Sequence, residues 1–321
     1  MLDYGRFVYK SRVWAGYANR AIKRSFSTQQ VNKRREILSS RQVSDFPVTP
    51  GAVMAVTMVK DEADIIGRVI NHLLEQEVDR VIVADNMSSD DTPQILAELA
   101  GEYPVTVVQD NLAAYYQSEK MTALAKLARN HGAKWVIPFD ADELWFAPGA
   151  TLASYLRASD KKQFRAAVHN AIPTETAGVW RLDQRAASLP KTAVATLPGM
   201  NISMGNHFVD RPGETDAGMR LIHLPWRSLE QIERKSTQGS FALRLPEHEG
   251  RLGRQWHETE TALAQDAAGL WQDLLNGNPH PALDLNWAAD SELITLDELP
   301  AWPFARPYDI TGPNPVSYTH L

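Results

Sequence analysis

The chain has 321 residues, of which 44% are hydrophobic and 22% are charged, as in a globular protein with a buried core. Its apolar runs are far shorter than the roughly 18 residues of a transmembrane helix, and its start lacks the pattern of a secretory leader. We therefore expect neither an integral membrane protein nor Sec export. Cysteine is absent, which excludes disulfides, thiolate nucleophiles and cysteine-bound metals, and which fits a reducing cytoplasm.

The charge is distributed unevenly along the chain. Residues 1–50 contain ten Lys/Arg and three Asp/Glu, whereas the rest of the chain contains 23 and 36. An acidic body argues against nucleic acid as the main partner. Residues 1–25 mix basic with aromatic and aliphatic side chains, which allows peripheral contact with anionic lipid or a solvated helix packed on its own domain. The lack of a clean polar/apolar division slightly favours the packed helix.

Residues 27–50 are polar and close with two prolines, which predicts a linker. Strands and helices then alternate, because β-branched apolar runs are followed by apolar residues at helical spacing. Strands are expected at 52–59, 80–84, 105–108 and 135–139, and helices at 62–76, 92–100 and 118–130. This alternation predicts an α/β fold with a mostly parallel sheet and helices on both faces. Ligands bind such sheets beyond the carboxyl ends of the strands.

The pattern weakens after residue 150. Strands are expected at 164–169, 191–197 and 218–224, and helices at 151–158, 228–237 and 255–275. We expect a basic extension and linker (1–50), a main domain with two halves (51–145 and 146–250), and a helical and irregular C-terminal extension (251–321). Residues 315–321 resemble a translated sequencing adapter, so the natural C-terminus is expected to differ.

Three polar clusters follow the first, second and fourth strands of the predicted sheet. They are Lys60-Asp61-Glu62, Asp85–Thr92 and Asp140-Ala141-Asp142-Glu143. The first two clusters, taken alone, could be capping turns. In an extended chain Asp140 and Asp142 would point the same way, and two adjacent anions need a cation between them. The pattern therefore predicts a Mg²⁺ or Mn²⁺ site that also takes substrate phosphate.

These segments resemble family 2 glycosyltransferases with the GT-A fold. The resemblance rests on Val56–Glu62, on Asp85-Asn86-x-Ser88-x-Asp90-x-Thr92, on Phe139–Glu143, and on His223-Leu-Pro-Trp226-Arg227-Ser228-Leu-Glu230-Gln231. It is greatest for the bacterial branch with an Asp-x-Asp-Glu signature, and it spans about residues 52–240. It implies a GT-A-like (Rossmann-like) domain over 51–250, with a nucleotide-binding half (51–145) and an acceptor half (146–250).

The resemblance also implies roles for individual residues. Thr57, Asp61 and Glu62 would line the base pocket, Asp85, Ser88 and Asp90 would hold base and ribose, Asp140 would lie near ribose and metal, and Asp142 would bind the metal. A downstream histidine often completes the metal site, and His223 is favoured over His207. Cations that could neutralise the diphosphate, or simply form solvated surface, are Lys120, Arg227, Arg234 and Lys235. Candidates for the base are Glu143, Glu175, Asp183 and Asp216, and we retain Glu143 and Asp216.

The expected function is inverting sugar transfer, with Mn²⁺ or Mg²⁺, from a nucleotide-diphosphate sugar, with a UDP-sugar favoured. The acceptor would be a glycan or a lipid-linked glycan in envelope polysaccharide synthesis. The protein would then be cytoplasmic or peripheral at the inner face of the plasma membrane. The alternatives are a nucleotidyltransferase, which the acidic Lys60–Asp64 loop disfavours because it would repel a triphosphate, and a silent nucleotide-sugar or glycan-binding protein.

Overall fold

The N-terminal segment is more ordered than a linker. The computed structural model describes residues 4–114, 116–244, 254–285, 287–288, 291–296, 299 and 301–302. Where a linker was predicted, the chain instead forms helix α2 (Thr28–Ser39), which follows α1 (Tyr4–Phe26), and strand β1 (Arg41–Val43). Ile37 of α2 is buried, and β1 pairs antiparallel with β4. The hydrophilic composition did not reveal these contacts because they join segments distant in sequence.

The predicted alternation of strands and helices is confirmed. The elements are β2 (Ala52–Val59), α3 (Ile66–Glu75), β3 (Arg80–Asp85), α4 (Thr92–Glu102), β4 (Val105–Asp110), α5 (Gln117–Asn130) and β5 (Ala133–Pro138). Strands β4, β3, β2 and β5 are neighbours and parallel. Helix α3 starts four residues later than predicted, because the backbone of its N-cap residue Ile65 is not helical (φ −137°, ψ −28°).

The second half extends the same sheet by a less regular path. Its elements are β6 (Glu143–Phe146), α6 (Leu152–Ala158), β7 (Gln163–Pro173), β8 (Val179–Asp183), β9 (Lys191–Ala195), β10 (Asn201–Ile202), η1 (Met204–Asn206), β11 (Val209–Asp210) and β12 (Thr215–His223). The order is β1-β4-β3-β2-β5-β9-β7-β12-β6, with β9 antiparallel to both of its neighbours. Strand β12 runs parallel to β7 and antiparallel to β6.

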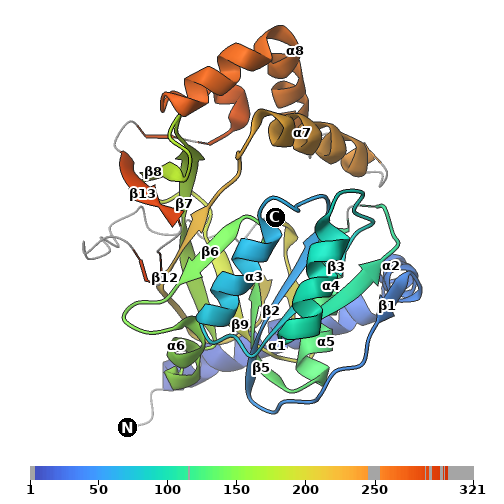
Figure 1. Ribbon diagram of the computed structural model, residues 1–321. Helices are drawn as coiled ribbons and strands as arrows, with labels where there is room; N and C mark the ends of the chain where they lie inside the picture. The colour runs from blue at the N-terminus through green and yellow to red at the C-terminus, as the bar shows by residue number, and fades with distance from the viewer. Residues whose placement is uncertain are drawn as a thin grey trace.

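The C-terminal elements lie over one end of the sheet. They are α7 (Leu229–Arg244), α8 (Arg254–Leu275), η2 (Pro281–Leu283) and β13 (Ser291–Thr295), which pairs with β8. In Figure 1, α7 and α8 are stacked above the sheet, on the side where β2 and β3 end. Ile172, Trp226, Ile232 and Leu274 form a small apolar core beneath them. None of the described helices is long and apolar enough to cross a membrane.

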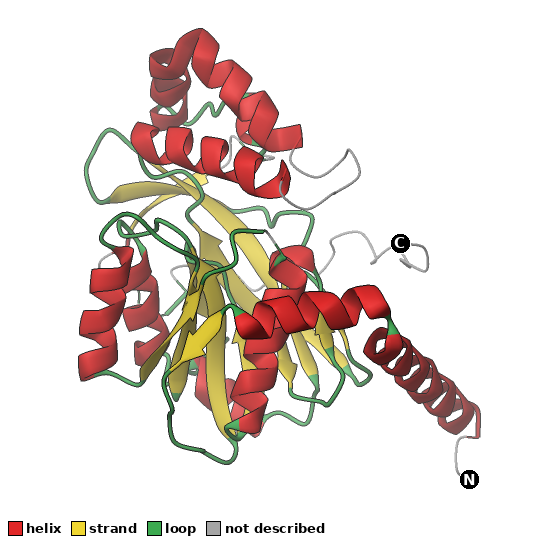
Figure 2. Ribbon diagram, turned by 90° about the vertical axis from the view of Figure 1, so that its right-hand side faces the viewer, coloured by secondary structure: helices red, strands yellow, loops and turns green. Residues whose placement is uncertain are grey.

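The sheet separates two apolar cores. Ile66, Ile70 and Leu96 bring α3 and α4 against one face, and Met121 and Leu124 bring α5 against the other. Figure 2 shows helices on both sides of the sheet. The expected α/β fold with a mostly parallel sheet covered on both faces is thus confirmed, and its rigid core leaves the loops at the strand ends to carry the polar residues.

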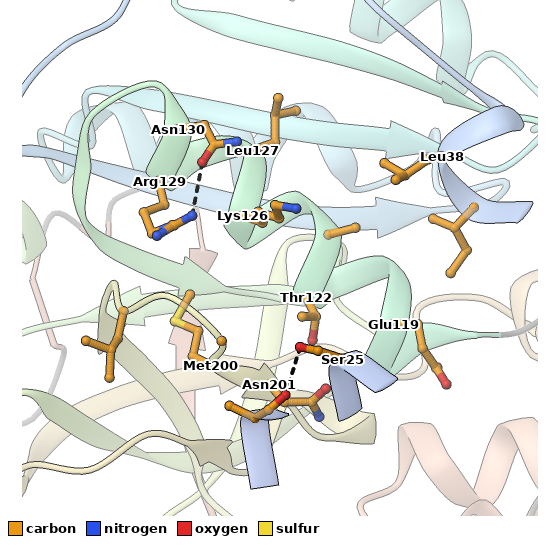
Figure 3. A pocket seen from close by; sticks show the side chains of 15 residues that line it. Ser25, Leu38, Glu119, Thr122, Lys126, Leu127, Arg129, Asn130, Met200 and Asn201 are labelled. Atoms are coloured by element: carbon orange, nitrogen blue, oxygen red, sulfur yellow. Dashed lines mark hydrogen bonds between the residues drawn. The ribbon is translucent and has the colours of Figure 1, made fainter. Parts of the chain in front are cut away.

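A groove of ≈ 500 Å³ lies outside this core, between α5 and the N-terminal helices. Figure 3 shows Leu38, Leu127 and Met200 along it, with Lys126 and Arg129 at α5. None of the polar clusters at the strand ends lines this groove, so it is separate from the candidate site described below.

The buried His72 is expected to make the free energy of unfolding depend on pH. Its Nε2 lies 2.8 Å from the carbonyl oxygen of Trp145, and burial lowers the pKa of His72 from 6.5 to about 4. The unfolded chain therefore binds the extra proton between pH 6.5 and 4, so the free energy of unfolding falls as pH drops through that window, by up to about 3 kcal/mol. Urea unfolding at pH 7, 6, 5 and 4.5 should show a shallower pH dependence for His72→Gln. The same slope as wild type would contradict this, and exposed His257→Gln is the matched control.

Candidate active site

Asp61 organises the carboxyl edge of β2. It has a left-handed φ of 53°, which asparagine and aspartate tolerate better than most residues. Its buried carboxylate accepts hydrogen bonds from the backbone N–H of Ser89 (2.6 Å) and Asp90 (3.3 Å) and from the side chain of Gln238. Burial raises the pKa of Asp61, but these hydrogen bonds and Lys60 bring it below its ordinary value. The loop after β2 is thereby fixed to the loop after β3.

The loop after β3 returns these contacts. Ser88 Oγ accepts from the N–H of Asp61 at 2.9 Å, and the N–H of Ser88 donates to Asp85 Oδ1 at 3.1 Å. Asp90 accepts from the N–H of Ala63 and of Thr92. Five of the residues expected to hold the nucleotide therefore lie together at the edge; they are Asp61, Glu62, Asp85, Ser88 and Asp90. Thr57 is fully buried on β2, behind this edge.

Lys120, a candidate for neutralising the diphosphate, forms a buried ion pair with Asp110. Its side chain is fully buried on α5, where Nζ lies 2.7 Å from Asp110 Oδ2 and donates to the carbonyl of Leu112 at 2.5 Å. Burial lowers the pKa of Lys120, and Asp110 partly offsets this. In this arrangement the ammonium group neutralises an internal carboxylate.

Asp140 and Asp142 do not share one direction. The chain turns after β5 instead of staying extended, since the N–H of Glu143 donates to the carbonyl of Asp140 at 3.2 Å. Asp140 therefore forms an ion pair with Lys191 and accepts from Asn206 at 2.9 Å. Asp142 is buried and points toward α7. The expectation that both carboxylates face one ligand is corrected by this turn.

The buried Glu143 side chain contacts the turn at Asp140–Asp142 from the protein interior. It is fully buried, with Oε1 2.9 Å from Lys191 Nζ and Oε2 accepting from the N–H of Asp140 and the indole of Trp145, each at 3.1 Å. Burial raises the pKa of Glu143 to about 7, although Lys191 opposes this. Its oxygens thus face the protein interior rather than the solvent side of the edge.

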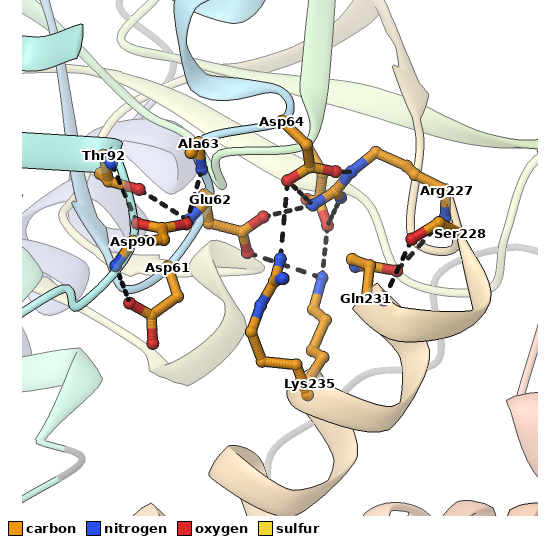
Figure 4. A network of polar contacts seen from close by, with 12 residues as sticks. Asp61, Glu62, Ala63, Asp64, Asp90, Thr92, Arg227, Ser228, Gln231 and Lys235 are labelled. Atoms are coloured by element: carbon orange, nitrogen blue, oxygen red, sulfur yellow. Dashed lines mark hydrogen bonds and ion pairs between the residues drawn. The ribbon is translucent and has the colours of Figure 1, made fainter. Parts of the chain in front are cut away.

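Helix α7 and the residues before it bring cations onto this edge (Figure 4). Arg227 pairs with Glu62, with Asp64 at 2.6 Å and with Asp142 at 3.7 Å. Lys235 Nζ lies 2.6 Å from Asp142 Oδ2 and 4.0 Å from Glu62. Burial would raise the pKa of Asp142, but Lys235 holds it well below its usual range. The acidic edge is thus largely neutralised by side chains of the same chain.

His223 faces Asp142 with an unprotonated nitrogen. Asn170 Nδ2 donates to the carbonyl of Leu285 at 2.9 Å, so Asn170 Oδ1 must face His223 Nδ1, which is 2.9 Å away. An amide oxygen only accepts, so Nδ1 carries the proton and Nε2 keeps its lone pair. Nε2 lies 3.6 Å from Asp142 Oδ1, and burial lowers the pKa of His223 to about 4. Two lone-pair donors therefore face each other.

The other expected residues lie elsewhere. His207 Nδ1 contacts the carbonyl of Pro190 at 2.9 Å, on the Asp140 side of the edge. Asp216 is exposed near the start of β12, at the opposite end of the strand from His223. Asp183 is buried and accepts from Ala288, and Glu175 accepts from Gln272 on α8. The structure does not bring Asp216 to the cluster around Asp142.

The sequence pattern did not indicate several residues that contact the expected site residues. Asp64, Asn170, Lys191 and Asn206 were not singled out, although each contacts an expected site residue. Lys191 and Asn206 reach Asp140 only because antiparallel β9 is inserted next to β5, which local periodicity does not reveal. Asn170 directly follows the predicted strand 164–169, but it lies inside β7, which continues to Pro173.

The chain is similar to one known protein family and to several solved structures. Residues 55–192 match the model of Glycosyl transferase family 2. No curated protein matches the sequence. Among solved structures, the mannosyltransferase PcManGT from Pyrobaculum calidifontis, in complex with GDP-Man and Mn²⁺, is 14% identical, with 86% of this chain and 88% of that chain covered and a TM-score of 0.39.

Two further structures are similar at the same low level. S. aureus TarS 1-349 in complex with UDP-GlcNAc is 10% identical over 66% of this chain and 71% of that chain, with a TM-score of 0.37. HddC from Yersinia pseudotuberculosis is 11% identical over 54% and 93%, with a TM-score of 0.32. Such scores define no shared substrate. The family match falls on the segment that supplies β2, β3, β5 and both aspartates, and the protein is a glycosyltransferase with a GT-A-like fold, in which this segment is similar to the family 2 model.

Proposed function

We propose that the enzyme transfers a sugar, with inversion, from a nucleotide-diphosphate donor in a reaction that depends on Mn²⁺ or Mg²⁺. The observation that carries this proposal is the pairing of Asp142 with the bare Nε2 of His223 at the edge where β2, β3 and β5 end. The loops around Asp61 and Asp90 would hold the nucleoside. A UDP-sugar is the favoured donor.

The donor set fits a divalent cation. Within the described residues no group of three or more His, Asp or Glu side chains converges. A carboxylate oxygen and an unprotonated imidazole nitrogen nevertheless face each other at 3.6 Å, and Mn²⁺ or Mg²⁺ commonly takes its other ligands from water and substrate phosphate. Asp142 and His223 would hold the metal, and Asp140, which Lys191 and Asn206 engage, would act toward the ribose. The metal, when bound, would stabilise charge on the departing nucleotide.

The cations of α7 would act on the same charge. Arg227 and Lys235 each pair with both Asp142 and Glu62. Guanidinium and ammonium groups also bind phosphate. We propose that both residues exchange part of these ion pairs for the diphosphate, so the donor would be held between α7 and the sheet edge.

A base must take the proton of the acceptor hydroxyl. Glu143 and Asp216 were the expected candidates. Glu143 is enclosed by Lys191 and Trp145, and we propose that it acts by positioning the Asp140–Asp142 turn. Asp216 would need to act from the far end of β12. We further propose a glycan or lipid-linked acceptor in envelope polysaccharide synthesis, at the cytoplasmic face of the membrane, with residues 1–25 in peripheral contact.

The test is release of nucleoside diphosphate from a panel of UDP-, GDP- and dTDP-sugars. The full chain is assayed with Mn²⁺, with Mg²⁺ and with a chelator. Slow release from one donor, present with metal and lost with chelator, is the expected result. No release from any donor, together with metal-dependent thermal stabilisation by UDP, would identify a silent binding protein instead. Release that is equal with metal and with chelator would overturn the metal requirement.

Asn170 gives a sharper check on the metal site. Asn170→Ala removes the acceptor that fixes the His223 tautomer, and loss of such an outer partner weakens metal sites by about 10–100-fold. We expect Mn²⁺ affinity, measured by electron paramagnetic resonance with UDP present, to fall by that factor. Nitrogen-15 NMR of the imidazole should show the proton on Nδ1 in wild type and a mixture of tautomers in the variant. Unchanged affinity would contradict this role, and Asn201→Ala is the control.

A further inference from the structure

We propose that α1, α2 and β1 form a docking surface for an anionic lipid bilayer. The inference goes beyond sugar transfer and does not depend on it. It extends the N-terminal contact considered above from residues 1–25 to a surface built by the described parts of residues 11–43.

Exposed apolar side chains are concentrated on these three elements. Of the eleven large hydrophobic residues that are exposed in the described part of the chain, five lie on these three elements. They are Trp14, Ile22, Phe26, Leu38 and Val43, and Phe26 is 82% exposed. Isolated exposed apolar residues are ordinary, but a cluster of aliphatic and aromatic groups on neighbouring elements marks an interaction site.

The same surface is positively charged. Arg12, Lys23 and Arg35 are exposed there, and the whole segment of residues 1–50 has ten basic and three acidic residues. Lys23 lies one turn before Phe26 on α1, and Arg12 lies nearly three turns before Ile22 on the same helix. Cations beside inserted apolar groups match the headgroups and acyl chains of an anionic membrane. A symmetric contact with a second copy would instead bring two positive surfaces together.

This surface is firmly attached to the enzyme. Tyr17 donates to the carbonyl of Pro198 at 2.6 Å, and Arg20 and Arg24 pair with Asp210 at 2.7 and 2.6 Å. These contacts occupy the inner side of α1 and leave Ile22 and Phe26 outward. In Figure 1 α1 passes behind the sheet to reach α2, and in Figure 2 the helix nearest the N-terminus stands out from the body.

The segment that α1 contacts also contacts the candidate active site. Pro198 and Asp210 bracket the segment that carries Asn206, which donates to Asp140. The groove beside α2 adds apolar volume bordered by Lys126 and Arg129 (Figure 3), where part of an acyl chain could lie. A bilayer bound to α1 would therefore hold the site at a fixed distance from lipid.

Vesicle flotation with the full chain tests the proposal. We expect binding to phosphatidylcholine vesicles containing 30% phosphatidylglycerol, little binding to pure phosphatidylcholine, and release in 0.5 M NaCl, because salt screens such attraction. Arg12→Gln with Lys23→Gln should weaken binding by about 25-fold, since each cation near the surface contributes about a factor of five. Ile22→Ser with Phe26→Ser should weaken it by more than about 10-fold.

Matched variants isolate the surface. Lys134→Gln with Lys162→Gln removes the same charge elsewhere, and Tyr103→Ser with Leu293→Ser removes exposed apolar groups elsewhere; both should bind like wild type. All variants should keep donor hydrolysis, because none alters the candidate site. Equal binding to neutral and anionic vesicles, or equal loss in the matched variants, would overturn the proposal. A third result would also overturn it. In that case the wild type does not bind vesicles but self-associates in sedimentation, and Ile22→Ser with Phe26→Ser abolishes the self-association.

Discussion

Replacing Asp142 with asparagine is expected to lower metal-stimulated donor hydrolysis by at least about 100-fold. The upper end of the loss from an outer partner of a metal site is already of that size, and Asp142 would be a direct ligand. Asparagine keeps the shape of the side chain but removes the charge that faces His223 Nε2 at 3.6 Å. Initial rates with saturating Mn²⁺, for wild type and variant, measure the effect.

Two controls separate chemistry from folding. The change also weakens the ion pairs of Asp142 with Lys235 and Arg227, so thermal unfolding is measured in parallel and the rates are compared per folded molecule. Asp216→Asn removes a carboxylate from the far end of β12 and should leave hydrolysis within about twofold of wild type if that carboxylate plays no part in the reaction. A fully active Asp142→Asn enzyme would place the metal site elsewhere, whereas an inactive Asp216→Asn enzyme would restore Asp216 as a base.

Changing Lys120 to methionine is expected to lower the free energy of unfolding by about 3–5 kcal/mol, because it leaves a buried carboxylate without its cation. Both side chains of the Lys120–Asp110 pair are fully buried, and the groups lie 2.7 Å apart. Urea unfolding at pH 7 measures the loss. The catalytic edge is untouched, so hydrolysis per folded molecule should persist.

The double variant decides whether the lost charge pairing is the cause. Lys120→Met with Asp110→Leu removes both charges and should recover part of the stability, since apolar replacements of buried pairs are often neutral, whereas the largely buried Arg41 loses the attraction of Asp110. Lys33→Met is the matched surface control. Its pair with Glu119 is partly exposed at 3.1 Å, so its loss should cost less than about 1 kcal/mol. A double variant as unstable as Lys120→Met would point to lost packing of the lysine stem.

The first half of the fold was predictable because its signals are local. Ile66, Val69, Ile70 and Leu73 recur at helical spacing and are all fully buried on α3. Each strand of β2, β3 and β5 is an apolar run followed by polar residues, so the edge with Asp61 and Asp90 could be located. Helix α2 was missed, since its anchor is one buried residue, Ile37, among hydrophilic neighbours.

The candidate site was predictable in its position and less so in its geometry. The sequence predicts Asp142 and His223 as metal ligands, and the structure places them 3.6 Å apart. The different directions of Asp140 and Asp142 depend on one backbone hydrogen bond at the turn, which residue spacing does not reveal. Lys191 comes near Asp140 only through the position of β9 in the sheet, and the Lys120–Asp110 pair depends on how α5 packs. Such contacts arise from tertiary packing, which a periodic pattern does not encode.

The sheet order makes the folding unit larger than the unit of family similarity. The matched segment ends at residue 192, yet β6, which lies inside it, pairs with β12, where Trp145 lies opposite Leu221 and Leu144 opposite Ile222. A fragment cut at residue 192 would leave β6 as an unpaired edge with buried-type side chains, which favours aggregation. The segments before and after residue 192 belong to one sheet, because β12 lies between β6 and β7. They should fold only when made together, so truncation to the matched segment would remove the strand that β6 needs.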